Sequence, residues 1–274
     1  MLSKEDYNRE IGKNIFIYPL DFARILGNSI DLTASEFAWT SDGKYIYDDV
    51  TGKISVPPHE TACVLTREAI YVKSNIGGTY HSRVSMAKKG FSHVGTMLDP
   101  EFFGQSLIVL HNTTNKALEI DAKNHERIVS IIFYYLNTPI LIESHKPNPG
   151  HVDKIEHFEN FDLYKKWNEE NRWASEKREL VNTFMTSEGY KDFIIKRDAD
   201  ENAWGDERKR RWKVFVQFLR NNALGYILLV VLSYVAFKVC FMIFPQSAVD
   251  QRAEIMAMLI VVLITKLSQD IKTK

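Results

Sequence analysis

Residues 61–72 have the sequence TACVLTREAIYV, in which two short apolar runs, 61–65 and 69–72, enclose a polar triplet. Runs of four or five apolar and β-branched residues are typical of strands and too short for helices. Runs of the same kind, separated by Gly, Pro, Asn and Asp, occur at 15–18, 107–110 and 128–136. Short strands with turn residues between them predict a β-barrel or sandwich from about residue 15 to residue 142.

The composition excludes several classes of function. Lys and Arg total 35, as do Asp and Glu, so the net charge of zero creates no general field that attracts nucleic acid. The two cysteines, Cys63 and Cys240, provide neither a disulfide framework nor a set of metal ligands, so no metal or other cofactor is predicted. The N-terminus has no apolar segment typical of a signal peptide, so we expect the first domain to be cytoplasmic.

The character of the chain changes after residue 145, where Glu, Lys, Arg and aromatic residues become frequent. Phe161, Tyr164 and Trp167 are spaced three apart, which predicts an amphipathic helix that packs on another element. We therefore expect a β-domain at 1–145, a charged helical linker at 146–220 and a membrane region at 221–274.

The membrane region is predicted from two apolar stretches, 223–244 and 253–268. The first has the roughly 20 residues that cross a bilayer, and the basic run RKRRWK at 208–213 would lie on its cytoplasmic side. The second is short for a span. We expect a helical hairpin in the cell inner membrane with both termini cytoplasmic, and the alternative is one span followed by an interfacial helix.

Four segments of the β-rich region, in order, resemble the dCTP deaminase and dUTPase superfamily. They are GNSIDL at 27–32, TREAI at 66–70, RVSMAKKGF at 83–91 and MLDPEFFG at 97–104, and Asn112 follows at the expected distance. The resemblance covers about half of the chain and implies a distorted β-barrel or jelly-roll domain of the dUTPase type. It also implies a trimer, because members of this superfamily build their sites from motifs of neighbouring chains.

The resemblance implies a nucleotide site at four residues. Arg83, Ser85 and Lys88 match the phosphate-binding motif of the superfamily, and they supply a bidentate fork, a hydroxyl and a point charge for phosphate oxygens. Asp99 matches the Asp that orients the attacking water in dUTPases, and it would contact the sugar or a water. Replacing Arg83 or Lys88 with Ala is expected to weaken nucleotide binding and to leave the melting temperature nearly unchanged.

The chain departs from the pattern of the superfamily at positions that carry the chemistry. Val84 replaces the first Ser of the phosphate motif, and Val109 stands where deaminases have the catalytic Glu, three residues before Asn112. An alkyl group cannot activate water. The segment at 125–130 lacks the Gly and Gln of the dUTPase pattern, and no Gly-rich arm follows. The sequence thus predicts no catalytic residues and a domain that is not an enzyme.

These observations predict a membrane effector whose dUTPase-like domain binds a nucleotide, linear or cyclic, and controls membrane-disrupting helices. A β-domain followed by two spans is the architecture of effectors in bacterial anti-phage nucleotide signalling, which is an analogy of architecture. The predicted partners are the nucleotide, the lipid bilayer and further copies of this chain. One alternative is a membrane-anchored nucleotide hydrolase that uses Asp99, and another is a scaffold that uses the barrel for oligomerisation.

Overall fold

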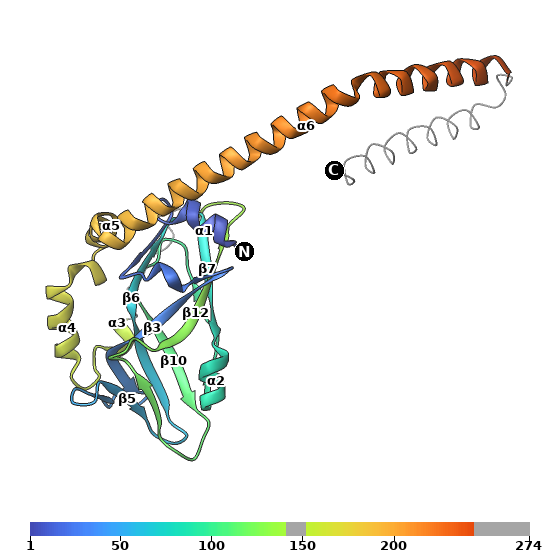
Figure 1. Ribbon diagram of the computed structural model, residues 1–274. Coiled ribbons are helices and arrows are strands. Elements are labelled where there is room, and N and C mark those ends of the chain that lie inside the picture. Colours follow the sequence, from blue (N-terminus) through green and yellow to red (C-terminus); the bar gives the residue numbers. More distant parts are fainter. Residues whose placement is uncertain (141–151, 244–274) are drawn as a thin grey trace. The chain divides into compact units, whose positions relative to one another are not determined.

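The structure is a computed structural model that describes residues 1–140 and 152–243 (Figure 1). Side chains are described up to residue 217, apart from 152 and 201, and then at 234, 235 and 238. The chain forms two compact units, Met1–Asp198 and Ala199–Lys274.

Strands dominate the first unit. In chain order they are β1 (Ile15–Tyr18), β2 (Ile25–Leu26), β3 (Ser29–Thr40), β4 (Tyr47–Asp48), β5 (Lys53–Val56), β6 (Thr61–Val72), β7 (Ile76–Ser82), β8 (Phe91–His93), β9 (Met97–Leu98), β10 (Phe103–Asn112), β11 (Leu118–Asp121) and β12 (Arg127–Tyr135). The main sheet has the order β8-β10-β6-β3-β12-β7-β9, with β1 paired to β6 and β2 to β3. A smaller sheet has the order β11-β5-β4. Every described strand pair is antiparallel.

Strands β3 and β6 form the centre of the main sheet, and both are 12 residues long. Because each is hydrogen-bonded on both edges, most of their side chains are buried. The core beneath them contains Ile15, Ile17, Leu32, Ile70 and Phe133, all fully buried. Burial of such side chains stabilises the fold by roughly 1.5–3 kcal/mol each.

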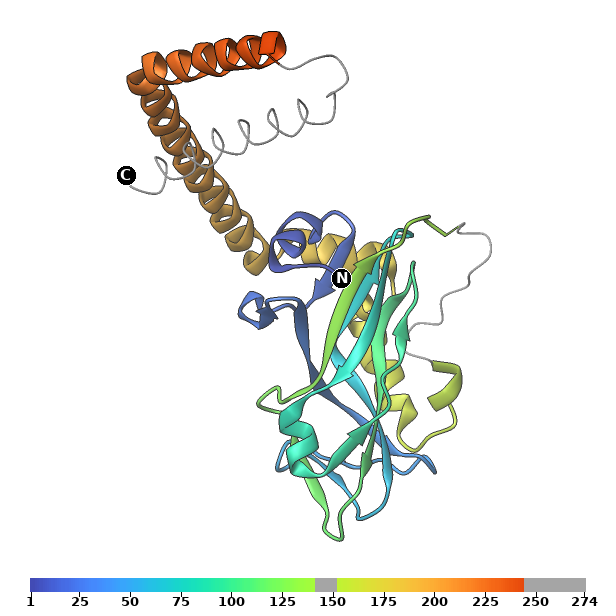
Figure 2. The same ribbon diagram turned by 90° about the vertical axis from the view of Figure 1, so that its right-hand side faces the viewer.

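Helices lie before, between and after the strands along the chain. They are α1 (Lys4–Glu10), η1 (Phe22–Arg24), α2 (Val84–Lys89), α3 (Val152–Ile155), α4 (Phe161–Glu170), η4 (Arg172–Ala174), α5 (Lys177–Thr186) and α6 (Glu188–Ile243). Helix α4 packs its buried Tyr164 against Phe37 of β3, with ring centroids 5.1 Å apart. Helix α5 packs Phe184 against Phe16 of β1. Figures 1 and 2 show α2, coloured teal, at the end of the β-domain away from α1.

The prediction of a mainly β domain followed by helices is confirmed. The two runs within residues 61–72 form one strand, β6, rather than two. The polar triplet stays in the sheet because its groups find partners there: the backbone carbonyl of Thr66 accepts from Gln105 Nε2, and the Glu68 carboxylate accepts from Thr33. Through the described strands the path of the main sheet runs from β8 to β9.

The membrane predictions concern the end of the chain. Among the helices whose side chains the structure describes, none is long and apolar enough to cross a membrane. Most side chains of the predicted first span, 223–244, and all of the second, 253–268, lie outside the described residues. The hairpin therefore stays a prediction.

Candidate functional site

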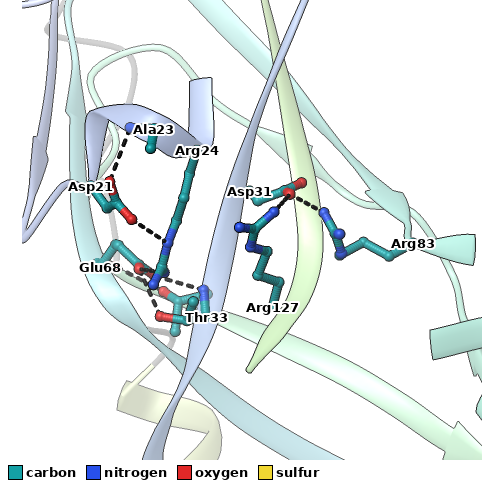
Figure 3. Close-up of polar contacts among 9 residues, drawn as sticks. Asp21, Ala23, Arg24, Asp31, Thr33, Glu68, Arg83 and Arg127 are labelled. Atoms are coloured by element: carbon teal, nitrogen blue, oxygen red, sulfur yellow. Dashed lines mark hydrogen bonds and ion pairs between the residues drawn. The ribbon is translucent and has the colours of Figure 1, made fainter. Parts of the chain in front are cut away.

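A buried carboxylate, Asp31, contacts two arginines, as Figure 3 shows, and it also accepts a hydrogen bond from a hydroxyl. Asp31 is 1% exposed, and Arg83 forms an ion pair with its Oδ2. Arg127 Nη1 lies 3.3 Å from the same oxygen, and Ser130 Oγ donates a hydrogen bond of 2.6 Å to Oδ1. Both guanidinium groups stay partly exposed, with 20% and 42% of their side chains accessible. Two guanidinium groups and one carboxylate give the cluster an excess positive charge. The contacts with Asp31 hold the two guanidinium groups in place, and such groups bind the oxygens of a phosphate chain.

The pairing of three strands builds this cluster. Asp31 on β3 lies opposite Ser130 on β12, and Ser130 lies opposite His81 on β7. Strand β7 ends at Ser82, so the next residue, Arg83, is the N-cap of helix α2 and lies close to Asp31. The first and third segments of the sequence that resemble the superfamily thus meet in space.

A second buried carboxylate, Glu68, lies on the other side of β3 (Figure 3). It is 2% exposed and accepts hydrogen bonds from the backbone N–H of Thr33 at 2.8 Å and from its hydroxyl at 2.7 Å. Arg24 Nη1 lies 3.4 Å from Glu68 Oε1, and Arg24 Nε lies 3.3 Å from Asp21. Burial raises the pKa of Glu68, although the Thr33 bonds and the Arg24 charge oppose this. Through these contacts Glu68 connects Arg24, in the segment before β2, to the main sheet.

The four predicted site residues do not form one cluster within the chain. Ser85 and Lys88 are exposed on α2, next to Arg83. Strand β7 pairs with β9 in antiparallel register, Gly78 with Leu98, so Asp99 lies near the start of β7 and Arg83 follows its end. At about 3.3 Å per residue, the length of β7 separates them by roughly 20 Å. Asp99 is exposed.

Sequence reasoning did not identify Arg127 and Ser130 as site residues. They are separated from Asp31 by 96 and 99 positions, and only the pairing of β3 with β12 brings them together. In the sequence, segment 125–130 differs from the dUTPase pattern by the Gly and Gln that it lacks, and this difference does not point to Arg127 or Ser130.

Comparison with known proteins identifies the family. A sequence model described as dCTP deaminase-like matches residues 1–136. The dCTP deaminases of Pyrococcus horikoshii and Pyrococcus abyssi are each 32% identical to this chain over 130 residues, which is 47% of this chain and 81% and 82% of those enzymes. The chain belongs to the dCTP deaminase-like family.

Solved structures of this family and of dUTPases are also similar to this chain. The dCTP deaminase from Agrobacterium tumefaciens has 12% identity and a TM-score of 0.41, over 52% of this chain and 50% of that one. The EIAV dUTPase has 16% identity and a TM-score of 0.35, over 50% of this chain and 98% of that one.

The prediction that this domain is not an enzyme is wrong, because its relatives at about 30% identity are dCTP deaminases. The prediction relied on the missing Gly, Gln and Gly-rich arm of the dUTPase pattern and on the alkyl side chains of Val84 and Val109. Both are exposed, at 85% and 43%, and neither is among the contacts of Asp31 or Glu68. Although Val84 and Val109 cannot activate water, the chain still has the carboxylates of Asp31, Glu68 and Asp99. A carboxylate can accept a proton or orient water.

Proposed function

We propose that the β-domain binds a pyrimidine deoxynucleoside triphosphate and hydrolyses it, either at the base or at the phosphate chain. The similarity of residues 1–136 to dCTP deaminases is the observation that carries this proposal. Attack of water on the amino-bearing carbon of cytosine releases ammonia, and attack on the α-phosphorus of a uracil nucleotide releases pyrophosphate. Both reactions consume one water and require a group that orients it and accepts its proton.

We assign phosphate binding to residues at the end of β7 and orientation of the attacking water to a residue near its start. Arg83, held in direction by Asp31, would bind phosphate oxygens together with Lys88 and the Ser85 hydroxyl. Asp99, at the other end, would orient the attacking water. A guanidinium has five N–H donors, so the pairing with Asp31 leaves Arg83 with donors for a ligand.

Within one chain the length of β7, roughly 20 Å of backbone, separates Asp99 from Arg83, which is far for two residues that act on the same phosphate chain. We propose that the Arg83 end of one copy and the Asp99 end of another form each site, in a trimer. Sedimentation of the full chain in detergent should give the mass of three copies, and a monomer at micromolar concentration would contradict this arrangement.

A second proposed function concerns the end of the chain. The apolar stretches at 223–244 and 253–268 and the basic run at 208–213 favour anchoring in a membrane with the β-domain on the cytoplasmic side. In that setting, binding of a linear or cyclic nucleotide would control the membrane segments, as in an anti-phage effector. The full chain should resist extraction from membranes by alkaline carbonate, and a soluble full chain would contradict anchoring.

Turnover by the purified full chain in detergent tests the first function. Ammonia release from dCTP and pyrophosphate release from dUTP are measured side by side, with ATP as a control for nonspecific hydrolysis. Lys88→Ala should weaken nucleotide affinity about ten- to a hundredfold, because it removes a charge-assisted phosphate contact. Lys191→Ala, an exposed lysine on α6, is the matched control. The proposal would be refuted if the chain showed no turnover of dCTP or dUTP and also bound neither nucleotide.

A further inference from the structure

Glu101 has an unusual place in the turn between β9 and β10. Its backbone φ is 63°, a left-handed conformation that is unfavourable for a residue with a Cβ atom. The residue is also only 7% exposed, although it carries a carboxylate. A buried charge in a strained backbone conformation persists only where neighbouring groups hold it.

Helix α5 supplies the group that holds Glu101. Lys177 Nζ lies 2.7 Å from Glu101 Oε2, and the Tyr71 hydroxyl lies 3.4 Å from the same oxygen. Lys177 Nζ also lies 4.1 Å from the centroid of the Tyr71 ring, which is a cation–π geometry. Partial burial would lower the pKa of Lys177, but the bonds to Glu101 and Tyr71 raise it, so the ammonium keeps its charge.

The position of Lys177 is fixed by the packing of α5. Leu180 and Phe184 of this helix are each 1% exposed. Phe184 contacts Phe16 with ring centroids 5.9 Å apart, and Phe16 stacks on Tyr71 at 5.5 Å. The helix and the tyrosine therefore form one packed group against the sheet, and the Lys177 side chain, 44% exposed, contacts this group through Tyr71 and Glu101.

The backbone of the turn links Glu101 to Asp99. The N–H of Phe102 donates to the carbonyl of Asp99 at 3.1 Å, and the N–H of Val72 donates to the carbonyl of Phe102 at 3.2 Å. Glu101 lies between the two residues of the first bond. The Glu101 side chain is therefore attached to the same hydrogen-bonded turn that presents Asp99.

We infer that Lys177 is a positioning residue for the nucleotide site: through Glu101 it fixes the turn that carries Asp99, so the helical region after the β-domain is part of the site. The inference rests on the proposed function for the role of Asp99 in orienting water. Helix α5 lies outside residues 1–136, which match the family model, so in this inference the turn that carries Asp99 is positioned by a residue outside that segment.

Kinetics of Lys177→Met test this role. Methionine keeps the apolar stem over the Tyr71 ring and removes the charge, and Lys191→Met on α6 is the matched control. If Asp99 orients water while the phosphates bind at the other end, kcat should fall about tenfold with KM nearly unchanged. The exchanged pair Glu101→Lys with Lys177→Glu should recover part of kcat. Glu101→Gly, which relaxes the left-handed backbone, should lose turnover more than thermal stability.

Hydrogen exchange gives a readout that needs no nucleotide. The amides of Phe102 and Val72 should exchange about three- to tenfold faster in Lys177→Met than in the wild type or in Lys191→Met. Unchanged exchange at both amides would overturn the inference, whether or not the wild type turns over nucleotide. Faster exchange with unchanged kcat in an active enzyme would overturn it as well, because the pair would then be structural only. An inactive wild type with faster exchange would refute the proposed function while confirming that Lys177 positions the turn.

Discussion

Arg83→Ala should lower both nucleotide affinity and the stability of the fold, whereas Lys88→Ala should lower affinity alone. The sequence predicted the same outcome for both residues, but the ion pair between Arg83 and Asp31 separates them. Asp31 is 1% exposed, so removing Arg83 takes a partner from a buried charge. Lys88 is exposed on α2, and its loss leaves no buried group unpaired.

The magnitude follows from the contacts that remain. Breaking a fully buried ion pair costs about 3–5 kcal/mol. Here Asp31 keeps the 2.6 Å bond from Ser130 and the 3.3 Å contact with Arg127, and the Arg83 side chain is 20% exposed. The expected loss is therefore about 1–3 kcal/mol. A loss of about 2 kcal/mol lowers the melting temperature of a domain of this size by roughly 4–8 °C.

Thermal unfolding of the full chain without nucleotide measures this loss by circular dichroism. Lys88→Ala is the control and should change stability by less than about 0.5 kcal/mol. A double-mutant cycle of Arg83→Ala and Asp31→Asn should give a coupling energy of about 0.5–3 kcal/mol. A melting temperature of Arg83→Ala equal to that of the wild type, or additive effects in the cycle, would refute this reasoning.

Three further outcomes are expected. Burial raises the pKa of Glu68 above its ordinary value of 4.5, so the folded state holds the proton more tightly and stability should fall as pH rises above about 4.5. Glu68→Gln should lack that decline in urea unfolding, and parallel pH profiles would contradict the assignment. Asn112→Ala should lower the free energy of unfolding by about 2–4 kcal/mol in the same assay. The buried amide of Asn112 donates to three backbone carbonyls and accepts from the Thr114 N–H. A loss below about 1 kcal/mol would contradict this reasoning. Gly12→Ala should also destabilise the fold, since φ is +83° and a Cβ would overlap both the hydroxyl and the ring of Tyr190. The same substitution should cost less in a Tyr190→Ala background, which lacks the ring.

Local pattern accounts for the parts of the fold that the sequence predicted. Strand β1 has the predicted bounds of 15–18, β10 contains the predicted run at 107–110, and β12 contains the predicted run at 128–136 except its last residue. These strands are short apolar runs flanked by turn residues, which is a signal that needs no tertiary contact. The order of the motifs along the chain likewise indicates the family without any tertiary contact.

Strand β3 shows what local pattern could not predict. It is 12 residues long and was not among the predicted strands, because Asp31, Thr33 and Ser35 interrupt its apolar residues. All three are buried, and each finds its partner on another strand: Ser130 on β12, Glu68 on β6 and the carbonyl of Leu65 on β6. Whether a polar residue can be buried depends on such partners, which the neighbouring sequence does not reveal.

The sequence by itself determined that the first half of this chain is a β-domain with the motifs of a nucleotide-binding family, because those signals are local. The tertiary structure alone decided how the motifs combine. Antiparallel pairing of β7 with β9 places Asp99 near the start of β7 and leaves Arg83 at its end, although both lie within residues 83–99. Pairing of β3 with β12 brings Arg127 to Asp31, and packing of α5 brings Lys177 to Glu101. Each contact joins segments remote in sequence, and the physical reason is that strand register and helix packing are set by burial across the whole domain.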